Sequence, residues 1–304
     1  MAPRSLIDVD DLSPAELVAL LDRATAFRIE PQRRDLLAGL AVLNLFFEAS
    51  TRTVTSFTLA AQRVGADVIS FTPGASSLGK GETIADTAIT LRAAGVSAIV
   101  TRHPESGFPR RLAESFDGPV INAGDGTHAH PTQALLDLLT LQSEFGRFAG
   151  LRVAICGDIL HSRVARSNIV GMKMLGIDLT LVGPHTLLPD DFSELGVRID
   201  RDVDAVLPNL DAIMMLRIQG ERISAGYLPS LDDYILRFQL NRERLARLPQ
   251  SAVILHPGPY NRGIELTDDV LEDPRSRYVA QVHNGVFVRM AVLEFLLKNA
   301  AVAA

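Results

Sequence analysis

The residues of this chain that could carry chemistry are hydroxyls and cations that follow short apolar runs. The first group is Ser50, Thr51, Arg52 and Thr53, which stands directly before a helix-like segment. The free N–H groups and the dipole of a helix start attract anions, and an arginine can form two parallel hydrogen bonds to a phosphate. The same hydroxyls could instead serve only as a helix cap. Taken alone, the group indicates either a phosphate site or an ordinary cap.

Further polar groups follow later apolar runs in the same way. In chain order they are the glycine-rich segment 74–81 with Ser76 and Lys80, then Arg102, the loop 124–131 with His130, Arg163, Arg217 with Gln219, and the segment 256–259. Each cation alone could be a surface ion pair or an interdomain salt bridge. Because so many of these groups follow the ends of apolar runs, the pattern favours an anion-binding site.

The segments that must position these residues alternate between strand-like and helix-like patterns. Apolar runs predict strands at 40–47, 67–71, 98–101, 119–122, 151–157, 177–182, 211–216 and 252–255. Helical patterns lie between them, among them 53–64, 84–94, 132–145 and 164–175. This alternation predicts an α/β fold whose mostly parallel sheets are flanked by helices. Ligands of such sheets bind beyond the carboxyl ends of the strands, which is where the polar groups fall.

The helical pattern over 132–145 comes after the first set of strands, and two glycines, Gly146 and Gly150, follow it before the second set begins. We therefore predict two α/β domains, residues 1–145 and 146–284. The apolar stretch 285–304 is interrupted by three charged residues, which predicts an amphipathic helix rather than a membrane span. This helix could pack back onto the first domain.

The composition indicates a well-packed globular protein, because 47% of the 304 residues are hydrophobic and 22% are charged. The net charge is -6 and no block of Lys or Arg occurs, which argues against a nucleic-acid groove or a membrane surface. The single cysteine, Cys156, lies in an apolar run and offers neither a disulfide nor a cysteine zinc site. The N-terminus has no apolar core typical of a signal peptide. We therefore expect a cytoplasmic protein.

Other motif assignments are weaker. Residues 74–80 match G-x-x-x-x-G-K, but Gly81 stands where a nucleotide-binding loop needs Ser or Thr to hold magnesium. Asp125, His128 and His130 could be imagined as metal ligands, yet their spacing fits no known zinc motif. The first strand of the second domain is not followed by G-x-G-x-x-G. We therefore expect no metal and no other cofactor.

Five segments together resemble a known family. They are 46–53 (F-F-E-A-S-T-R-T), 80–83 (K-G-E-T), 130–137 (H-P-T-Q-A-L-L-D), 157–163 (G-D with Arg163), and 256–263 (H-P-G-P, then N-R-G). In this order they resemble the catalytic chains of aspartate carbamoyltransferases. The run S-T-R-T is shared with ornithine carbamoyltransferases, which typically carry His-Cys-Leu-Pro where this chain has H-P-G-P. That segment, with Arg217 and Gln219, favours aspartate over another amine acceptor such as ornithine.

The resemblance implies transfer of the carbamoyl group of carbamoyl phosphate to the amine of L-aspartate, an early step of de novo pyrimidine synthesis. The carbamoyl phosphate ligands it implies are Ser50, Thr51, Arg52, Thr53, Arg102, His130, Gln133, Gly258 and Pro259. The aspartate ligands it implies are Lys80, Arg163, Arg217 and Gln219. The residues that would act on the reacting atoms are Arg52, Thr53, His130 and Lys80.

The resemblance further implies a homotrimer with shared active sites. A loop with Lys80 and a serine would reach into the neighbouring subunit. That serine is Ser76 or Ser77, and counting back from Lys80 favours Ser76. A regulatory chain or another pyrimidine enzyme is a further candidate partner, whereas neither nucleic acid nor a membrane is expected.

Overall fold

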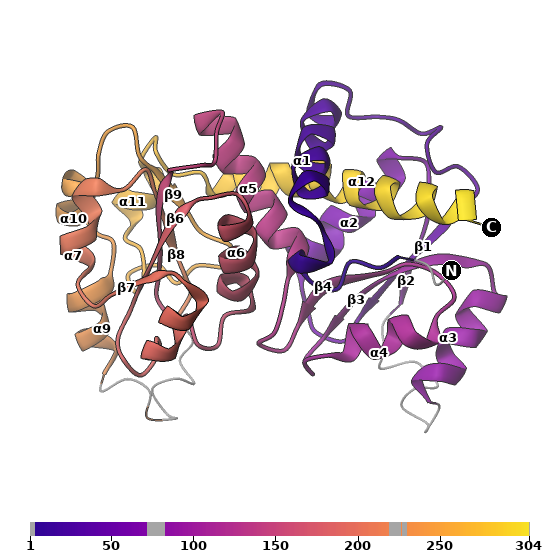
Figure 1. Cartoon of the computed structure of the whole chain (residues 1–304), viewed down its shortest axis with the longest axis horizontal. Helices are drawn as coiled ribbons and strands as arrows, with labels where there is room; N and C mark the ends of the chain where they lie inside the picture. The colour runs from indigo at the N-terminus through magenta and orange to yellow at the C-terminus, as the bar shows by residue number, and fades with distance from the viewer. Residues whose placement is uncertain (1–3, 72–82, 219–225, 227–229, 304) are drawn as a thin grey trace. The chain divides into compact units, whose positions relative to one another are not determined.

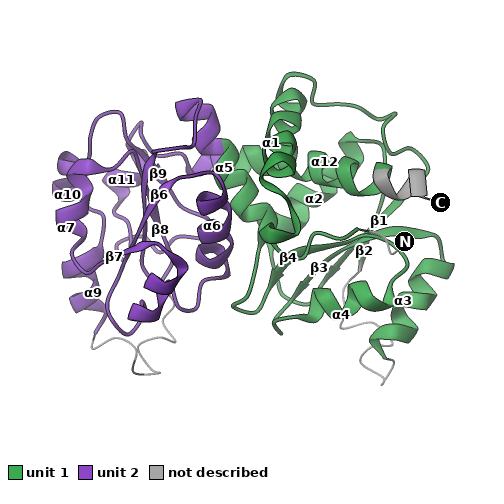
Figure 2. Ribbon diagram, viewed as in Figure 1, with its two compact units in different colours: residues 1–139, 282–304 green, residues 140–281 purple. Residues whose placement is uncertain are grey.

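A computed structural model describes residues 4–71, 83–218, 226 and 230–303 of the chain (Figure 1). The chain forms two compact units: Met1–Leu139 with Val282–Ala304, and Thr140–Gln281 (Figure 2). The division falls within helix α5 (Pro131–Phe145) rather than after it. The C-terminal residues are grouped with the first part of the chain. Each unit holds one parallel sheet with helices around it, which confirms the predicted α/β fold class.

The sheet of the first unit has the order β2-β1-β3-β4 in the described part of the chain. Its strands are β1 (Ala41–Phe46), β2 (Asp67–Phe71), β3 (Val96–His103) and β4 (Val120–Asp125). All neighbouring pairs are parallel, so the carboxyl ends of the strands share one edge. β3 and β4 run further than the apolar pattern predicted, because their pairing continues as far as His103 opposite Asp125.

Helices cover both faces of this sheet (Figure 1): α1 (Pro14–Ile29), α2 (Thr51–Arg63) and α12 (Tyr278–Ala303) lie on one side, α3 (Ile84–Ala93) and α4 (Phe108–Ser115) on the other. The alternation of side chains along β1 explains this arrangement. Leu43 and Leu45 join the apolar core under α3 and α4. Asn44 points the opposite way and donates to the Thr58 hydroxyl of α2 at 3.1 Å.

The sheet of the second unit has the order β7-β6-β5-β8-β9 among the described residues, and its pairs are all parallel. Its strands are β5 (Arg152–Cys156), β6 (Asp178–Val182), β7 (Arg198–Asp200), β8 (Ala212–Met215) and β9 (Val253–Leu255). The sequence pattern missed β7, because this edge strand has three residues and two of them are charged. The helices that lie wholly within the described part of this unit are α6 (Arg163–Met174), α7 (Val203–Val206), α9 (Leu231–Phe238), α10 (Arg242–Arg247) and α11 (Asp268–Glu272).

The thiol of Cys156 lies in the apolar core of the second unit, together with Tyr234 and Phe238. Burial raises the pKa of this thiol to about 12. Because only a thiolate is a strong nucleophile, we expect Cys156 in the native protein to resist a disulfide reagent such as DTNB at pH 8. In denaturant, one thiol per chain should react at once. Rapid stoichiometric labelling of the native protein would contradict the buried position.

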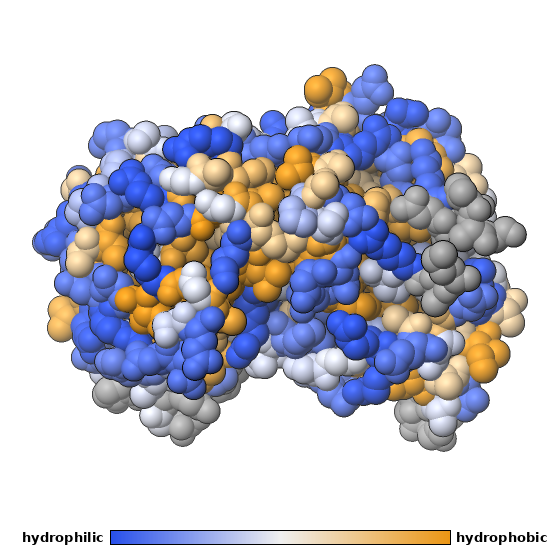
Figure 3. All heavy atoms as spheres, viewed as in Figure 1, coloured by the Kyte–Doolittle hydropathy of each residue, from blue (hydrophilic) through white to orange (hydrophobic). Residues whose placement is uncertain are grey.

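Helix α12 carries charge on its buried side. The amphipathic pattern suggests that Arg289, Glu294 and Lys298 face solvent, but Arg289 is only 3% exposed and Glu294 is 9% exposed. Glu294 is paired with Arg23 of α1 at 2.6 Å and with Lys298 at 2.8 Å. No helix in the described part of the chain is long and apolar enough to cross a membrane. On the face drawn in Figure 3, hydrophilic and apolar residues are interspersed over both units.

Candidate active site

The start of α2 has the features of an anion site. Ser50 is the N-cap residue, but its side chain makes no capping hydrogen bond. The first backbone bond of the helix runs from the Val54 N–H to the Ser50 carbonyl. The N–H groups of the first turn, from Thr51 to Thr53, therefore have no partner within the helix. The simple capping role considered for the Ser50 hydroxyl is wrong, and the helix start offers its donors to a bound group.

Arg102 is fixed beside this helix start. It lies opposite Phe46 in the pairing of β3 with β1. Its Nε donates to the Glu48 carboxylate at 3.0 Å, and its Nη1 donates to the Ala123 carbonyl at 3.3 Å. The backbone carbonyl of Arg102 also accepts the Phe47 N–H at 2.8 Å. These bonds hold a cation at the same sheet edge as Ser50, and they identify Glu48 as a partner that the sequence did not reveal.

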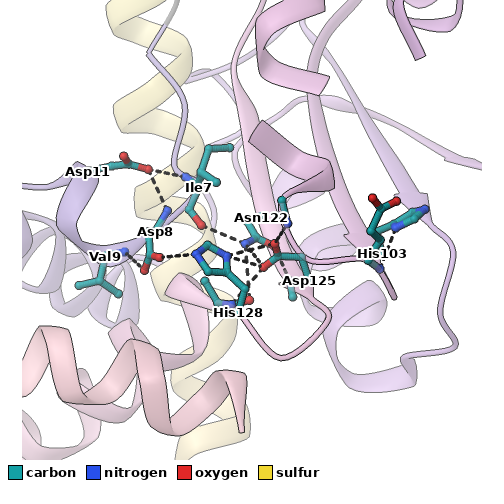
Figure 4. Close-up of polar contacts among 12 residues, drawn as sticks. Ile7, Asp8, Val9, Asp11, His103, Asn122, Asp125 and His128 are labelled. Atoms are coloured by element: carbon teal, nitrogen blue, oxygen red, sulfur yellow. Dashed lines mark hydrogen bonds and ion pairs between the residues drawn. The ribbon is translucent and has the colours of Figure 1, made fainter. Parts of the chain in front are cut away.

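The loop after β4 is organised by the buried carboxylate of Asp125 (Figure 4). This carboxylate accepts the Gly107 N–H at 2.7 Å, the Asn122 amide at 2.8 Å and the Ala129 N–H at 3.1 Å. The His128 ring nitrogen Nδ1 lies 3.1 Å from the same group. Asp125 thus defines the path of the chain directly before His130.

The imidazole of His128 lies between two carboxylates in Figure 4. Its Nδ1 faces Asp125, and its Nε2 lies 3.3 Å from Asp8. Burial raises the pKa of Asp8. Within the described residues, no three His, Cys, Asp or Glu side chains form a group that could hold a metal ion. Because its ring lies between Asp8 and Asp125, His128 links the N-terminal segment to the loop after β4.

Replacing Asp125 by Asn is expected to destabilise the protein. The new amide nitrogen is itself a donor and would face donors that the Asp125 carboxylate now accepts. Each buried donor left without a partner costs about 1–3 kcal/mol. Urea unfolding should show a lower midpoint with an unchanged slope. The exposed Asp117 of the same unit provides the control, since Asp117→Asn removes one charge and should leave the free energy of unfolding within about 0.5 kcal/mol of that of the starting protein. Equal midpoints for both variants would contradict the assigned role.

His130 and Gln133 lie at the start of α5. His130 is 4% exposed, and its carbonyl accepts the Gln133 N–H at 3.0 Å. Gln133 is 8% exposed and donates from Nε2 to Asp137 at 3.0 Å. Because β4 leads directly into this loop and helix, both side chains follow the carboxyl edge that also carries Arg102.

In the second unit, two predicted cations follow neighbouring strands. Arg163 is the first residue of α6, which begins after β5, and the Ser162 hydroxyl caps this helix by accepting the Ala165 N–H at 3.1 Å. Arg217 is exposed and is separated from the end of β8 only by Leu216. Because β5 and β8 pair in parallel, the two guanidinium groups belong to one edge of the sheet.

A third segment, 256–259, follows β9 at the same edge and contains a cis Gly258-Pro259 peptide bond. The His256 Nδ1 accepts the Gly258 N–H at 2.9 Å, and its Nε2 lies 3.3 Å from the buried Glu265. Glu265 also accepts the Asn261 N–H, and the Asn261 amide donates to the Ile218 carbonyl at 2.6 Å. Asn261 therefore connects this segment to the chain directly after Arg217.

The structure places the predicted residues of each unit at the carboxyl edge of that unit's sheet. Those of the first unit are Ser50, Thr51, Arg52, Thr53, Arg102, His130 and Gln133, and those of the second are Arg163, Arg217, Gly258 and Pro259. Ser76, Ser77, Lys80 and Gln219, together with the segment 74–80, lie outside the described residues. Sequence reasoning missed Glu48, Asp125 as an organiser, and Glu265. The only signal for them was a carboxylate next to a polar motif.

Two family models match the chain in succession. The carbamoyl-P binding domain of aspartate/ornithine carbamoyltransferase matches residues 4–143, and the Asp/Orn binding domain matches residues 149–296. The chain belongs to the aspartate/ornithine carbamoyltransferase family. The first model covers the helix start, Arg102 and the His130 loop, and the second covers Arg163, Arg217 and the segment 256–259.

Relatives within this family carry the name of the aspartate enzyme. The chain is 51% identical over 301 residues to the aspartate carbamoyltransferase catalytic subunit of Salinispora arenicola, covering 97% of this chain and 98% of the relative. It is also 51% identical over 303 residues to that of Rhodospirillum rubrum, covering 98% and 95%.

Solved structures of both branches of the family have the same fold as this chain. Aspartate transcarbamoylase from Trypanosoma cruzi in complex with carbamoyl phosphate superposes with a TM-score of 0.88 at 32% identity, covering 96% of this chain and 95% of the other. Ornithine carbamoyltransferase from Thermus thermophilus gives 0.87 at 30% identity, covering 98% and 100%. Backbone similarity therefore does not separate the two amine acceptors, whereas sequence identity favours aspartate.

Proposed function

We propose that this protein is an aspartate carbamoyltransferase. It transfers the carbamoyl group of carbamoyl phosphate to the amine of L-aspartate and releases N-carbamoyl-L-aspartate and phosphate. The observation that carries the proposal is the identity of about half of all residues, over nearly the whole chain, to aspartate carbamoyltransferase catalytic subunits. The cationic edges of the two sheets have the chemistry that the two anionic substrates require.

Carbamoyl phosphate binds to the first unit in this proposal. Its phosphate accepts the free N–H groups at the start of α2 and the hydroxyls of Ser50, Thr51 and Thr53. Arg52 and Arg102 supply charge-assisted hydrogen bonds, which are about twice as strong as neutral ones. Glu48 offsets part of the charge of Arg102, because the two groups already form an ion pair. This ion pair keeps the guanidinium in place before the substrate arrives.

The reaction needs stabilised negative charge rather than a covalent nucleophile. The neutral amine of aspartate attacks the carbonyl carbon, and charge develops first on the carbonyl oxygen and then on the leaving phosphate. His130, Thr53 and Arg52 act as the donors to that oxygen, like an oxyanion hole. The proton of the attacking aspartate amine passes to the departing phosphate, or to the Lys80 side chain if that side chain is uncharged. Holding both substrates in line provides a further large share of the rate.

Aspartate binds to the second unit. Its two carboxylates need two cationic clamps, which Arg163 and Arg217 provide, with Gln219 and Lys80 as further ligands. The backbone of Gly258 and Pro259 receives the amino group of carbamoyl phosphate. The hydrogen bonds through His256, Glu265 and Asn261 support this assignment, because they link that backbone to the chain after Arg217.

The assembly in this proposal is a homotrimer, in which the loop with Ser76 and Lys80 completes the site of a neighbouring subunit. Sedimentation or native mass measurement of the purified chain tests the trimer. Mixing catalytically dead Lys80→Ala and Arg52→Ala subunits tests sharing, since a shared site predicts that some activity returns on mixing. A regulatory chain or another pyrimidine enzyme is a further partner to seek by the same mass measurement in extracts. We expect the enzyme to act in the cytoplasm.

The deciding experiment offers the purified chain carbamoyl phosphate with aspartate, ornithine or both, and identifies the products by mass spectrometry. We expect carbamoyl aspartate and phosphate in equal amounts, with no added metal or nucleotide. Formation of carbamoyl ornithine instead would establish the alternative acceptor, which the structural similarity to the ornithine enzyme makes the one rival worth testing.

A further inference from the structure

A buried carboxylate of α5 determines which way the amide of Gln133 points. The Asp137 side chain is fully buried, and its Oδ1 accepts a hydrogen bond from Gln133 Nε2 at 3.0 Å. An ionised carboxylate can only accept hydrogen bonds, so it must face the NH2 group of the amide and not its oxygen. The Gln133 Oε1 is therefore kept on the side of the amide away from Asp137.

Asp137 lies near a buried cation of helix α12. Arg289 is 3% exposed, and burial lowers the pKa of its guanidinium to about 9, while the charge of Asp137 acts in the opposite direction. At neutral pH the guanidinium thus stays protonated, and its charge favours an ionised Asp137. A protonated Asp137 could have presented its hydroxyl to the oxygen of Gln133 instead. Arg289 therefore secures the acceptor character on which the amide orientation depends.

The position of Arg289 is itself defined by α2 and α12. Its Nη1 donates to the Ser56 hydroxyl at 2.7 Å, and its guanidinium lies over the Phe57 ring, 4.9 Å from the centroid. Gly285 provides the necessary space, because a Cβ atom at this position would lie 2.5 Å from the Arg289 Nη1. Arg289 thus connects the phosphate-binding helix, the C-terminal helix and the charge of Asp137.

The orientation of Gln133 matters because of the chemistry of the substrate. The carbamoyl group ends in NH2, a hydrogen-bond donor, whereas an acetyl group ends in CH3, which makes no such bond. The cations and backbone N–H groups proposed to bind carbamoyl phosphate are themselves donors and cannot accept from NH2. A correctly turned Gln133 supplies an acceptor in the first unit, in addition to the backbone of Gly258 and Pro259 that is proposed to receive the same NH2. Sites built to hydrogen-bond an NH group reject analogues that lack it, because the site group is then left unpaired.

We infer that Asp137, whose carboxylate accepts from the Gln133 amide, is a positioning residue that turns the Gln133 oxygen toward the carbamoyl NH2 and so sets the preference for carbamoyl phosphate over acyl phosphates. The inference rests on the proposed function. Asp137 does not touch the substrate and acts only through Gln133. The rest of the phosphate site treats the two compounds alike, since both carry the same phosphate.

The test is the ratio of the dissociation constants of acetyl phosphate and carbamoyl phosphate, measured by titration calorimetry. In Asp137→Asn the single oxygen of the new amide is drawn to Arg289, so its NH2 faces Gln133 and turns the Oε1 inward. We expect carbamoyl phosphate to bind about tenfold more weakly, the factor that one ordinary hydrogen bond supplies. Acetyl phosphate and inorganic phosphate should bind within about twofold of their starting affinities, so the ratio falls by about the same tenfold factor.

Two further variants make the result independent of folding losses in Asp137→Asn. Arg289→Gln removes the charge near Asp137 and should also lower the ratio of the two dissociation constants. Arg289→Lys retains the charge, so its ratio should fall less. Asp117→Asn, which removes an exposed carboxylate, is the matched control and should keep the starting ratio. An unchanged ratio in both Asp137→Asn and Arg289→Gln would overturn the inference, as would equal weakening of all three ligands. Failure of the starting protein to bind carbamoyl phosphate would instead contradict the proposed function.

Discussion

Replacing His130 by alanine is expected to lower kcat by about 100- to 1000-fold, because one oxyanion-hole donor contributes about 2.7–4 kcal/mol to the transition state. The residue is 4% exposed and stands directly before α5, where its carbonyl accepts hydrogen bonds from the first turn, so it has little freedom to move away from its position. The donor acts mainly when charge develops on the carbonyl oxygen. The KM for either substrate should therefore change much less than kcat.

The measurement is steady-state production of carbamoyl aspartate at saturating substrates, alongside a thermal melting curve for each variant. His283→Ala is the matched control, because His283 is exposed and its ring contacts Phe287 of the same helix. This control should retain both kcat and the melting temperature. A His130→Ala enzyme with near-normal kcat would show that the carbonyl oxygen is stabilised elsewhere. A variant that melts far below the starting protein would assign His130 to structure instead.

Replacing Arg217 by alanine is expected to raise the KM for aspartate by about 10- to 150-fold, since a hydrogen bond to a charged group contributes about 1.5–3 kcal/mol. Arg217 is exposed at the end of β8 and is not part of the core, so folding should be unaffected. The KM for carbamoyl phosphate should stay within about twofold, because that ligand is assigned to residues at the edge of the other sheet.

Arg237→Ala serves as the control for this second experiment. Arg237 is a half-exposed arginine of α9 in the same unit, where it pairs with Asp233, and its removal changes the net charge by the same amount. Both KM values should then be unchanged. If Arg217→Ala raised the two KM values equally, the guanidinium would not be a specific aspartate ligand. Succinate, which has the two carboxylates without the amine, should lose inhibitory potency in parallel with the aspartate KM.

The amine acceptor itself is decided by few groups. The TM-scores against an aspartate and an ornithine enzyme are nearly equal, at 0.88 and 0.87, so the path of the backbone is common to both. Selectivity must lie in side chains and short loops at the sheet edge of the second unit. Two of the candidates, Arg217 and the segment 256–259, are linked by Asn261 through its bond to the Ile218 carbonyl. A substitution in one of them is therefore expected to shift the position of the other.

Local sequence was sufficient for eight of the described strands, for helices such as α2, α3, α5 and α6, and for the polar residues that follow these strands. Apolar runs such as the one around β1 and the hydroxyl-rich start of α2 contain their own signals, because side-chain alternation and free helix N–H groups depend only on neighbouring residues. The parallel α/β arrangement followed from the alternation of elements, and with it the edge at which the polar groups gather. The short edge strand β7 was not predicted, because three residues are too few to show the alternation of a strand.

The long-range partners could not be found in this way. Glu48 is 54 residues from Arg102, and Ser56 is 233 residues from Arg289, yet each pair forms a hydrogen bond. In sequence, Arg289 looks like the solvent face of an amphipathic helix. It is buried because Gly285 leaves room for it and because α2 and α5 supply a hydroxyl and a carboxylate. The sequence alone thus determined which side chains carry the chemistry. Only the tertiary structure decided which partners hold them in position, because those pairs form only when strands and helices that are distant in sequence pack together.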